Sequence, residues 1–108
     1  MAKKEKVTEL TKKEFEKFIE KGTSVIDFFA DWCMPCVMMG PITEELAAEF
    51  KDKIKFGKIN VDENRELSQK FRVMSIPNFV LFKDGKKIDQ FIGAMSKEDF
   101  EDRIKKHL

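Results

Sequence analysis

Two cysteines, Cys33 and Cys36, are the only ones in the chain, and two residues separate them. They follow an apolar run at residues 25–30, which is long enough for one buried strand, and the pattern after them is helical. At a helix start, free N–H groups and the positive end of the helix dipole stabilise a thiolate, the nucleophilic form of cysteine. Pro35 suits the first turn, where its missing N–H would have no partner in the helix. Two sulfurs at this spacing can form and reopen a small disulfide, so the pattern predicts redox chemistry.

Two charged residues interrupt apolar patterns. Asp27 lies in the run at residues 25–30, which is typical of a central strand covered on both faces, so its carboxyl should stay neutral, be paired or have a raised pKa. It could accept a proton behind the dithiol, or be an exposed strand-end carboxylate if the register differs. Lys58 shares a predicted strand face with Ile54 and Phe56. It could tune the charge of Asp27, or extend its ammonium from the sheet to solvent.

Length and charge limit the class of protein. The 108 residues suffice for one domain, residues 1–108, and the net charge of +1 gives no electrostatic reason for binding nucleic acid or an anionic membrane. Residues 1–6 should be frayed, and residues 1–10 lack the apolar core of a signal peptide. We therefore expect a cytoplasmic protein. Thiols are mostly reduced there, which favours a catalytic or metal-binding pair over a structural disulfide.

Periodicity and turn residues predict an α/β fold with helices on both faces of a mixed sheet. Strands are expected at residues 7–10, 25–30, 54–61, 78–82 and 87–92, and helices at residues 12–21, 34–50, within 62–70 and from 97 to the end. A capping box of Thr11 and Glu14 should start the first helix. Pro41 should kink the second helix or divide it into two, and Met38 and Met39 are expected to be packing residues.

Several motifs in this chain resemble those of the thioredoxin family. W-C-M-P-C at residues 32–36 is similar to the family's W-C-G-P-C, and matching segments in the same order and spacing cover nearly the whole chain. These segments are V-I-D-F-F-A-D-W-C, M-G-P-I-T-E-E-L, K-I-N-V-D-E-N, V-M-S-I-P-N-F-V-L-F-K-D-G and F-I-G-A-M-S-K. The departures are Met34 for the usual Gly, Val37 for the common Lys and Asn78 for the usual Thr. The resemblance implies a thioredoxin fold, a central mixed β-sheet of four to five strands flanked by helices on both faces.

The resemblance also implies a mechanism of protein-disulfide reduction. Cys33, exposed at the helix start, would attack a substrate disulfide, and Cys36, which is more buried, would then release the product. Asp27 would take the proton of Cys36 through water, with Lys58 nearby. The reversible Cys33–Cys36 disulfide would be the redox group, with no cofactor. The retained Pro35 favours a reductase over an oxidant.

An apolar collar around the sulfurs is implied for binding varied partners. Its expected members are Trp32, Pro35, Ile76, Pro77, Gly93 and Ala94. The general preference of X-Pro bonds is trans, but the resemblance of S-I-P-N to the family's loop predicts a cis bond between Ile76 and Pro77. Backbone held near the sulfurs there could pair with an incoming peptide. The implied partners are protein disulfides and a thioredoxin reductase as electron donor, and the expected assembly is a monomer.

Two other classes of function stay open. Zinc usually needs four Cys or His ligands, and this chain has two Cys and a distant His107, so a closed site would require two chains that share their cysteine pairs. The chain could also be an interaction module of the same fold whose redox pair is idle.

Overall fold

A five-stranded sheet forms the centre of the protein, and a computed structural model describes residues 6–108 of the chain. The spatial order is β1-β3-β2-β4-β5, and β1, β3 and β2 are parallel whereas β4 runs antiparallel to both β2 and β5. The strands are β1 (Thr8–Glu9), β2 (Thr23–Phe29), β3 (Ile54–Asn60), β4 (Asn78–Lys83) and β5 (Lys86–Ile92). The predicted mixed sheet is therefore confirmed. The expected fraying of residues 1–6 falls, except for Lys6, outside the described residues.

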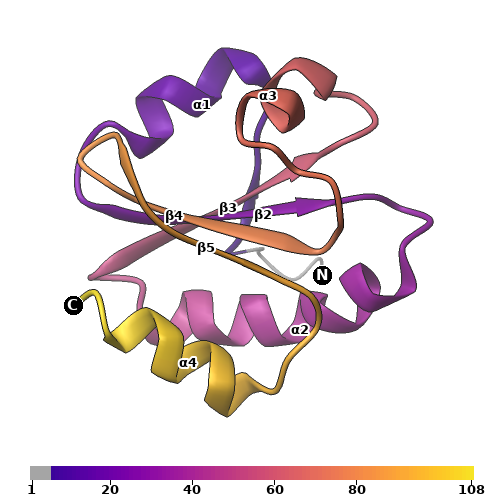
Figure 1. Ribbon diagram of the computed structural model, residues 1–108. Coiled ribbons are helices and arrows are strands. Elements are labelled where there is room, and N and C mark those ends of the chain that lie inside the picture. Colours follow the sequence, from indigo (N-terminus) through magenta and orange to yellow (C-terminus); the bar gives the residue numbers. More distant parts are fainter. Residues whose placement is uncertain (1–5) are drawn as a thin grey trace, which may run out of the picture.

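Helices cover both faces of the sheet, as predicted. They are α1 (Lys12–Ile19), α2 (Met34–Glu49), α3 (Arg65–Lys70) and α4 (Lys97–Lys105). α1 and α3 lie on one face, and α2 and α4 lie on the other (Figure 1). Within residues 6–108, no helix combines the length and apolar character needed to cross a membrane.

Successive side chains of β2 belong to two separate cores, one on each face of the sheet. Val25 packs with Leu46 of α2 and Phe100 of α4 on one face of the sheet. Ile26 packs with Phe15 of α1 on the other face. Because successive strand residues point to opposite faces, Asp27 lies on the same face as Val25, beneath α2. The central strand thus places the carboxyl on the side from which the cysteine helix packs.

The helix starts and ends follow local signals. The Glu14 carboxylate accepts hydrogen bonds from the backbone N–H of Thr11, at 3.3 Å, and from its hydroxyl, so the side chain of Glu14 reaches back to the N-cap as predicted. α2 runs without interruption through Pro41, so the alternative of two helices is wrong.

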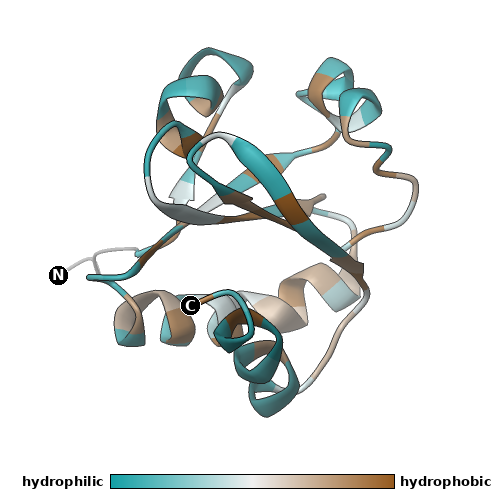
Figure 2. Cartoon of the chain, turned by 60° about the vertical axis from the view of Figure 1, so that its left-hand side comes forward, coloured by the Kyte–Doolittle hydropathy of each residue, from teal (hydrophilic) through white to brown (hydrophobic). Residues whose placement is uncertain are grey.

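The prediction for Met38 is wrong, because its side chain is 67 % exposed whereas Met39 is buried. The buried residues of α2 recur at helical spacing from Cys36 through Met39 and Thr43, and Met38 falls outside that stripe. Along the chain, α2 is visibly more apolar than the strongly hydrophilic α4 (Figure 2). The exposed part of this apolar character lies in the first turns of α2, next to the cysteines.

Candidate active site

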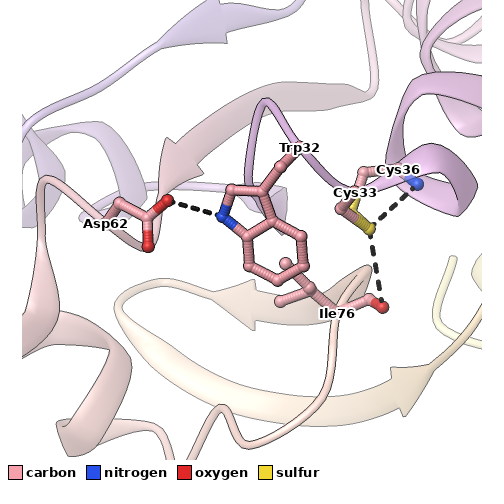
Figure 3. The surroundings of a disulfide bond; sticks show 5 residues. All are labelled: Trp32, Cys33, Cys36, Asp62 and Ile76. Carbon is pink, nitrogen blue, oxygen red and sulfur yellow. Dashed lines mark hydrogen bonds between the residues drawn. A yellow bond between two sulfur atoms is a disulfide. The ribbon is translucent and has the colours of Figure 1, made fainter.

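The dithiol lies at the junction of β2 and α2, as the spacing predicted. Cys33 is the N-cap residue of α2, with extended backbone, and the backbone N–H of Cys36 donates to its Sγ at 3.3 Å (Figure 3). The two sulfurs are joined in a disulfide, with 5.2 Å between the Cα atoms. A sulfur in this position faces the free amides and the positive end of the helix dipole, which favour a thiolate when the pair is reduced.

The expected difference in exposure between the two cysteines is wrong for this disulfide form, because each residue is 5 % exposed. Both pack with Ala30 and with the partly buried Phe29 and Ile76. The Sγ of Cys33 lies 3.8 Å from the carbonyl oxygen of Ile76, so the loop before β4 covers this sulfur (Figure 3). That covering comes from a segment more than forty positions away and has no local signal.

Trp32 forms one side of the surface around the disulfide. Its side chain is 70 % exposed, and its Nε1–H donates to the Oδ2 of Asp62 at 2.8 Å (Figure 3). Asp62 is not among the site residues predicted from the sequence. A signal was present, because Asp62 follows the end of β3, which pairs in parallel with β2, and parallel strands end at the same edge of a sheet.

The loop before β4 and the end of β5 form another part of this surface. The Ile76–Pro77 peptide bond is cis, which confirms the prediction. The backbone N–H of Gly93 donates to the carbonyl oxygen of Pro77 at 2.8 Å. Gly93 has φ +101, in the region that side chains with a Cβ rarely adopt, which explains a glycine at this contact. Of the other expected collar residues, Pro35 is exposed in the first turn of α2 and Ala94 is exposed beside Gly93.

Asp27 is buried below the disulfide. It is 6 % exposed, so the alternative of an exposed strand-end carboxylate is wrong. Burial raises the pKa of Asp27 to about 7, and the ammonium of Lys58 opposes part of that rise. Asp27 and Lys58 face each other across β2 and β3 as register partners. The Oδ1 atom of Asp27 has no hydrogen-bond partner among the described residues.

Lys58 is partly buried, and its Nζ lies 5.5 Å from the centre of the Phe29 ring. A cavity of about 880 Å³, which extends along α2 from Cys36 to Ala48, brings Lys58 together with Asp27 and Cys36. The cavity is polar at this end and has ample room for water, which a buried carboxylate without a protein partner can bind. The structure therefore brings the predicted carboxyl, ammonium and second cysteine to one cavity.

Metal ligands are sparse near this site. Across residues 6–108, no group of three or more His, Cys, Asp and Glu side chains is placed to hold a metal ion. The zinc alternative needs the free sulfurs of two chains, and in this structure the two sulfurs of the chain bind each other.

A sheet that delivers two cysteines to a helix start, joined in a disulfide, defines a thiol–disulfide oxidoreductase. The family model described as Thioredoxin matches residues 6–106. The chain belongs to the thioredoxin family.

Named relatives agree over almost the whole length. A thioredoxin of Staphylococcus aureus (strain Mu50) is 40 % identical over 102 residues, which are 94 % of this chain and 98 % of the relative. The solved structure of Malassezia sympodialis thioredoxin aligns with a TM-score of 0.85 at 33 % identity, covering 99 % of this chain and 95 % of that one. A chain from a structural study of thiol resolution in yeast mitochondrial 1-Cys peroxiredoxin via glutathione/thioredoxin systems has the same TM-score at 36 % identity, covering 95 % of this chain and 99 % of that one.

Proposed function

We propose that this protein reduces disulfide bonds in other proteins through Cys33 and Cys36. The Cys33 thiolate attacks one sulfur of the substrate disulfide, forms a mixed disulfide and expels the other substrate sulfur as a thiolate, which takes a proton. The Cys36 thiolate then attacks Cys33 Sγ and releases the second substrate thiol. The substrate gains two electrons, and this chain is left with the disulfide seen here. This proposal depends chiefly on the hydrogen bond that the Cys36 N–H donates to Cys33 Sγ at the helix N-cap.

Asp27 is our proposed proton acceptor for Cys36. The two side chains line the same cavity, where water can relay the proton. A carboxyl with a pKa of about 7 exists in both forms at neutral pH, which suits a group that must take up and release a proton. Lys58 is the proposed charge partner that limits the rise of this pKa.

Substrate proteins would bind on the surface around the sulfurs. The proposed contact residues are those of the predicted collar: Trp32, Pro35, Ile76, Pro77, Gly93 and Ala94. The carbonyl of Ile76, 3.8 Å from Cys33 Sγ, is the proposed backbone contact for an extended substrate peptide. We further propose that a thioredoxin reductase restores the dithiol, and that the protein works as a monomer in the cytoplasm, where such a donor keeps thiols reduced.

The direct test is reduction of insulin disulfides by dithiothreitol, followed by turbidity. Wild type should accelerate the reaction well beyond a Cys33→Ser variant, and Cys36→Ser should accumulate a mixed disulfide with the substrate. Equal rates for wild type and Cys33→Ser would reject catalysis and leave the idle interaction module as the interpretation. Metal analysis of reduced protein belongs beside this assay, because one zinc ion per two chains would support the shared zinc site instead.

A further inference from the structure

The loop between α3 and β4, residues 71–77, presents Ile76 to the disulfide, and one side chain holds both ends of this loop. The Nε2 of Gln90, on β5, donates at 3.0 Å to the carbonyl oxygen of Phe71, where the loop begins. The same nitrogen donates at 3.0 Å to the Oδ1 of Asn78, where the loop ends. The two N–H groups of one amide therefore span the loop.

The orientation of this amide is determined by its surroundings. The ammonium of Lys87 donates to Gln90 Oε1, so the oxygen of the amide already has a donor partner. Rotating the amide by half a turn would place its oxygen against two acceptor oxygens and its nitrogen against a cation. The Gln90 amide is thus held with both donors toward the loop.

Burying Asn78, at the other end of the loop, costs folding free energy. We call the two hydrogen bonds from Gln90 Nε2 to Phe71 and Asn78 the clamp. It is fully buried, and its Nδ2 has no hydrogen-bond partner among the described residues. A buried donor without a partner destabilises the folded state. Only its Oδ1, which accepts from Gln90, offsets that cost. The start of the loop is anchored differently, because the Phe71 ring packs 5.5 Å from Phe15 and 5.3 Å from Phe82.

We infer that Gln90 is a positioning residue for protein substrates, acting through the loop at residues 71–77. With both ends held, the Ile76 carbonyl stays beside Cys33 Sγ in the orientation that an extended peptide needs. Gly93, directly after β5, also donates its backbone N–H to the Pro77 carbonyl at the end of the loop. This inference rests on the proposed reduction of protein disulfides.

Two kinds of disulfide substrate should depend differently on this loop. A peptide disulfide uses the backbone of the loop, so loosening the loop weakens its binding. A small aromatic disulfide needs only access to the sulfur and does not pair with the loop.

Gln90→Met keeps the side-chain length and removes both donors. It should raise the KM for a disulfide-bonded peptide about three- to tenfold with kcat unchanged, since one or two hydrogen bonds no longer order the loop. Its rate with 5,5′-dithiobis(2-nitrobenzoate) should stay within about twofold of wild type.

Asp89→Asn is the matched control, because Asp89 is adjacent on β5 and its side chain contacts Arg103 and His107 but not the loop. Its Oδ1 also accepts a hydrogen bond from the backbone N–H of Gln90 at 2.8 Å, and the asparagine side chain keeps an oxygen for this bond. It should lower stability without changing the KM. Asn78→Leu is the second variant, which removes one end of the clamp and should raise the KM about two- to threefold. An unchanged KM in Gln90→Met or Asn78→Leu, equal slowing with the small disulfide, or an equal KM rise in Asp89→Asn would overturn the inference. A wild type that fails to reduce the peptide would reject the proposed function itself.

Discussion

At the scale of single residues, the most consequential position is Asp27. It is a carboxyl in the middle of a buried strand, without a protein hydrogen bond to its Oδ1, and it lines the cavity that Cys36 shares. The sequence alone predicted that this carboxyl would be buried and perturbed, because it interrupts an apolar run. The family resemblance implied that Cys36 and Lys58 lie near it, and the packing of β2, β3 and α2 brings the three side chains to one cavity.

A test of this burial is the pH dependence of stability. The folded state holds the proton of Asp27 up to about pH 7, whereas the ordinary pKa of the group is 3.8, so the folded state binds more protons between these values. The free energy of unfolding of wild type therefore falls as pH rises through this window, and it levels off above it. Asp27→Asn, which does not titrate, should be more stable than wild type by up to about 4 kcal/mol at pH 8 and nearly equal to it at pH 4.

Urea unfolding of the oxidised protein at several pH values measures this difference. Asp52→Asn, at an exposed position before β3, should follow wild type throughout. A gap that is constant with pH would contradict a raised pKa. Lys58→Met should raise the pKa of Asp27 further, as seen in the carbon chemical shift of its carboxyl, because the opposing positive charge is lost.

At the scale of elements, most of the helices and strands could be predicted, because each carries its own start or stop signal. Contacts between elements had no such signal. The C-terminal helix α4 shows this, since Asp89 of β5 accepts two hydrogen bonds from Arg103, each at 2.9 Å, and contacts His107 Nε2 at 2.9 Å. Nothing in the local sequence around His107 indicates this contact with β5.

Removing this anchor should destabilise the protein. The Arg103 guanidinium, with further hydrogen bonds from His107 and a backbone amide, holds the pKa of Asp89 well below its usual range. Such a group stabilises the fold above its ordinary pKa, and this contribution is lost as pH falls below about 4. Asp89→Asn should therefore lower the free energy of unfolding by about 1–2 kcal/mol at neutral pH, with a smaller difference from wild type in acid.

Chemical denaturation at pH 7 and below pH 4 checks this expectation. Asp102→Asn, at an exposed position on α4, is the matched control and should stay within about 0.5 kcal/mol of wild type at pH 7. An Asp89→Asn variant as stable as wild type at pH 7 would show that the helix is held by its apolar contacts alone.

At the scale of the whole molecule, one sheet separates two cores, and each strand of the centre contributes to both. On one side, the Phe100 ring lies 4.7 Å from Phe79 and 5.3 Å from Phe91. On the other, Phe15 lies 5.5 Å from Phe82. Because β4 carries Phe79 and Phe82 on opposite faces, neither core can be lost while the other stays intact.

The two cores should therefore unfold together. Phe100→Ala and Phe15→Ala remove buried rings from opposite faces, and each should lower the free energy of unfolding by about 3–5 kcal/mol. Both variants should show one transition, with the same midpoint by far-UV circular dichroism and by Trp32 fluorescence. Ile88→Ala, at a surface position of β5, should change stability by less than about 1 kcal/mol. Separate transitions for the two probes would contradict a shared sheet as the unit of folding.

The order of strands and helices, the cysteine pair at a helix start and the buried carboxyl were determined by the sequence itself, because each depends on spacing within a few residues. The tertiary structure alone decided the equal burial of Cys33 and Cys36 and the clamp that Gln90 makes across a distant loop. These features depend on which segments the sheet order brings side by side. Local propensity carries no information on such contacts, because their partners are separated by many residues along the chain.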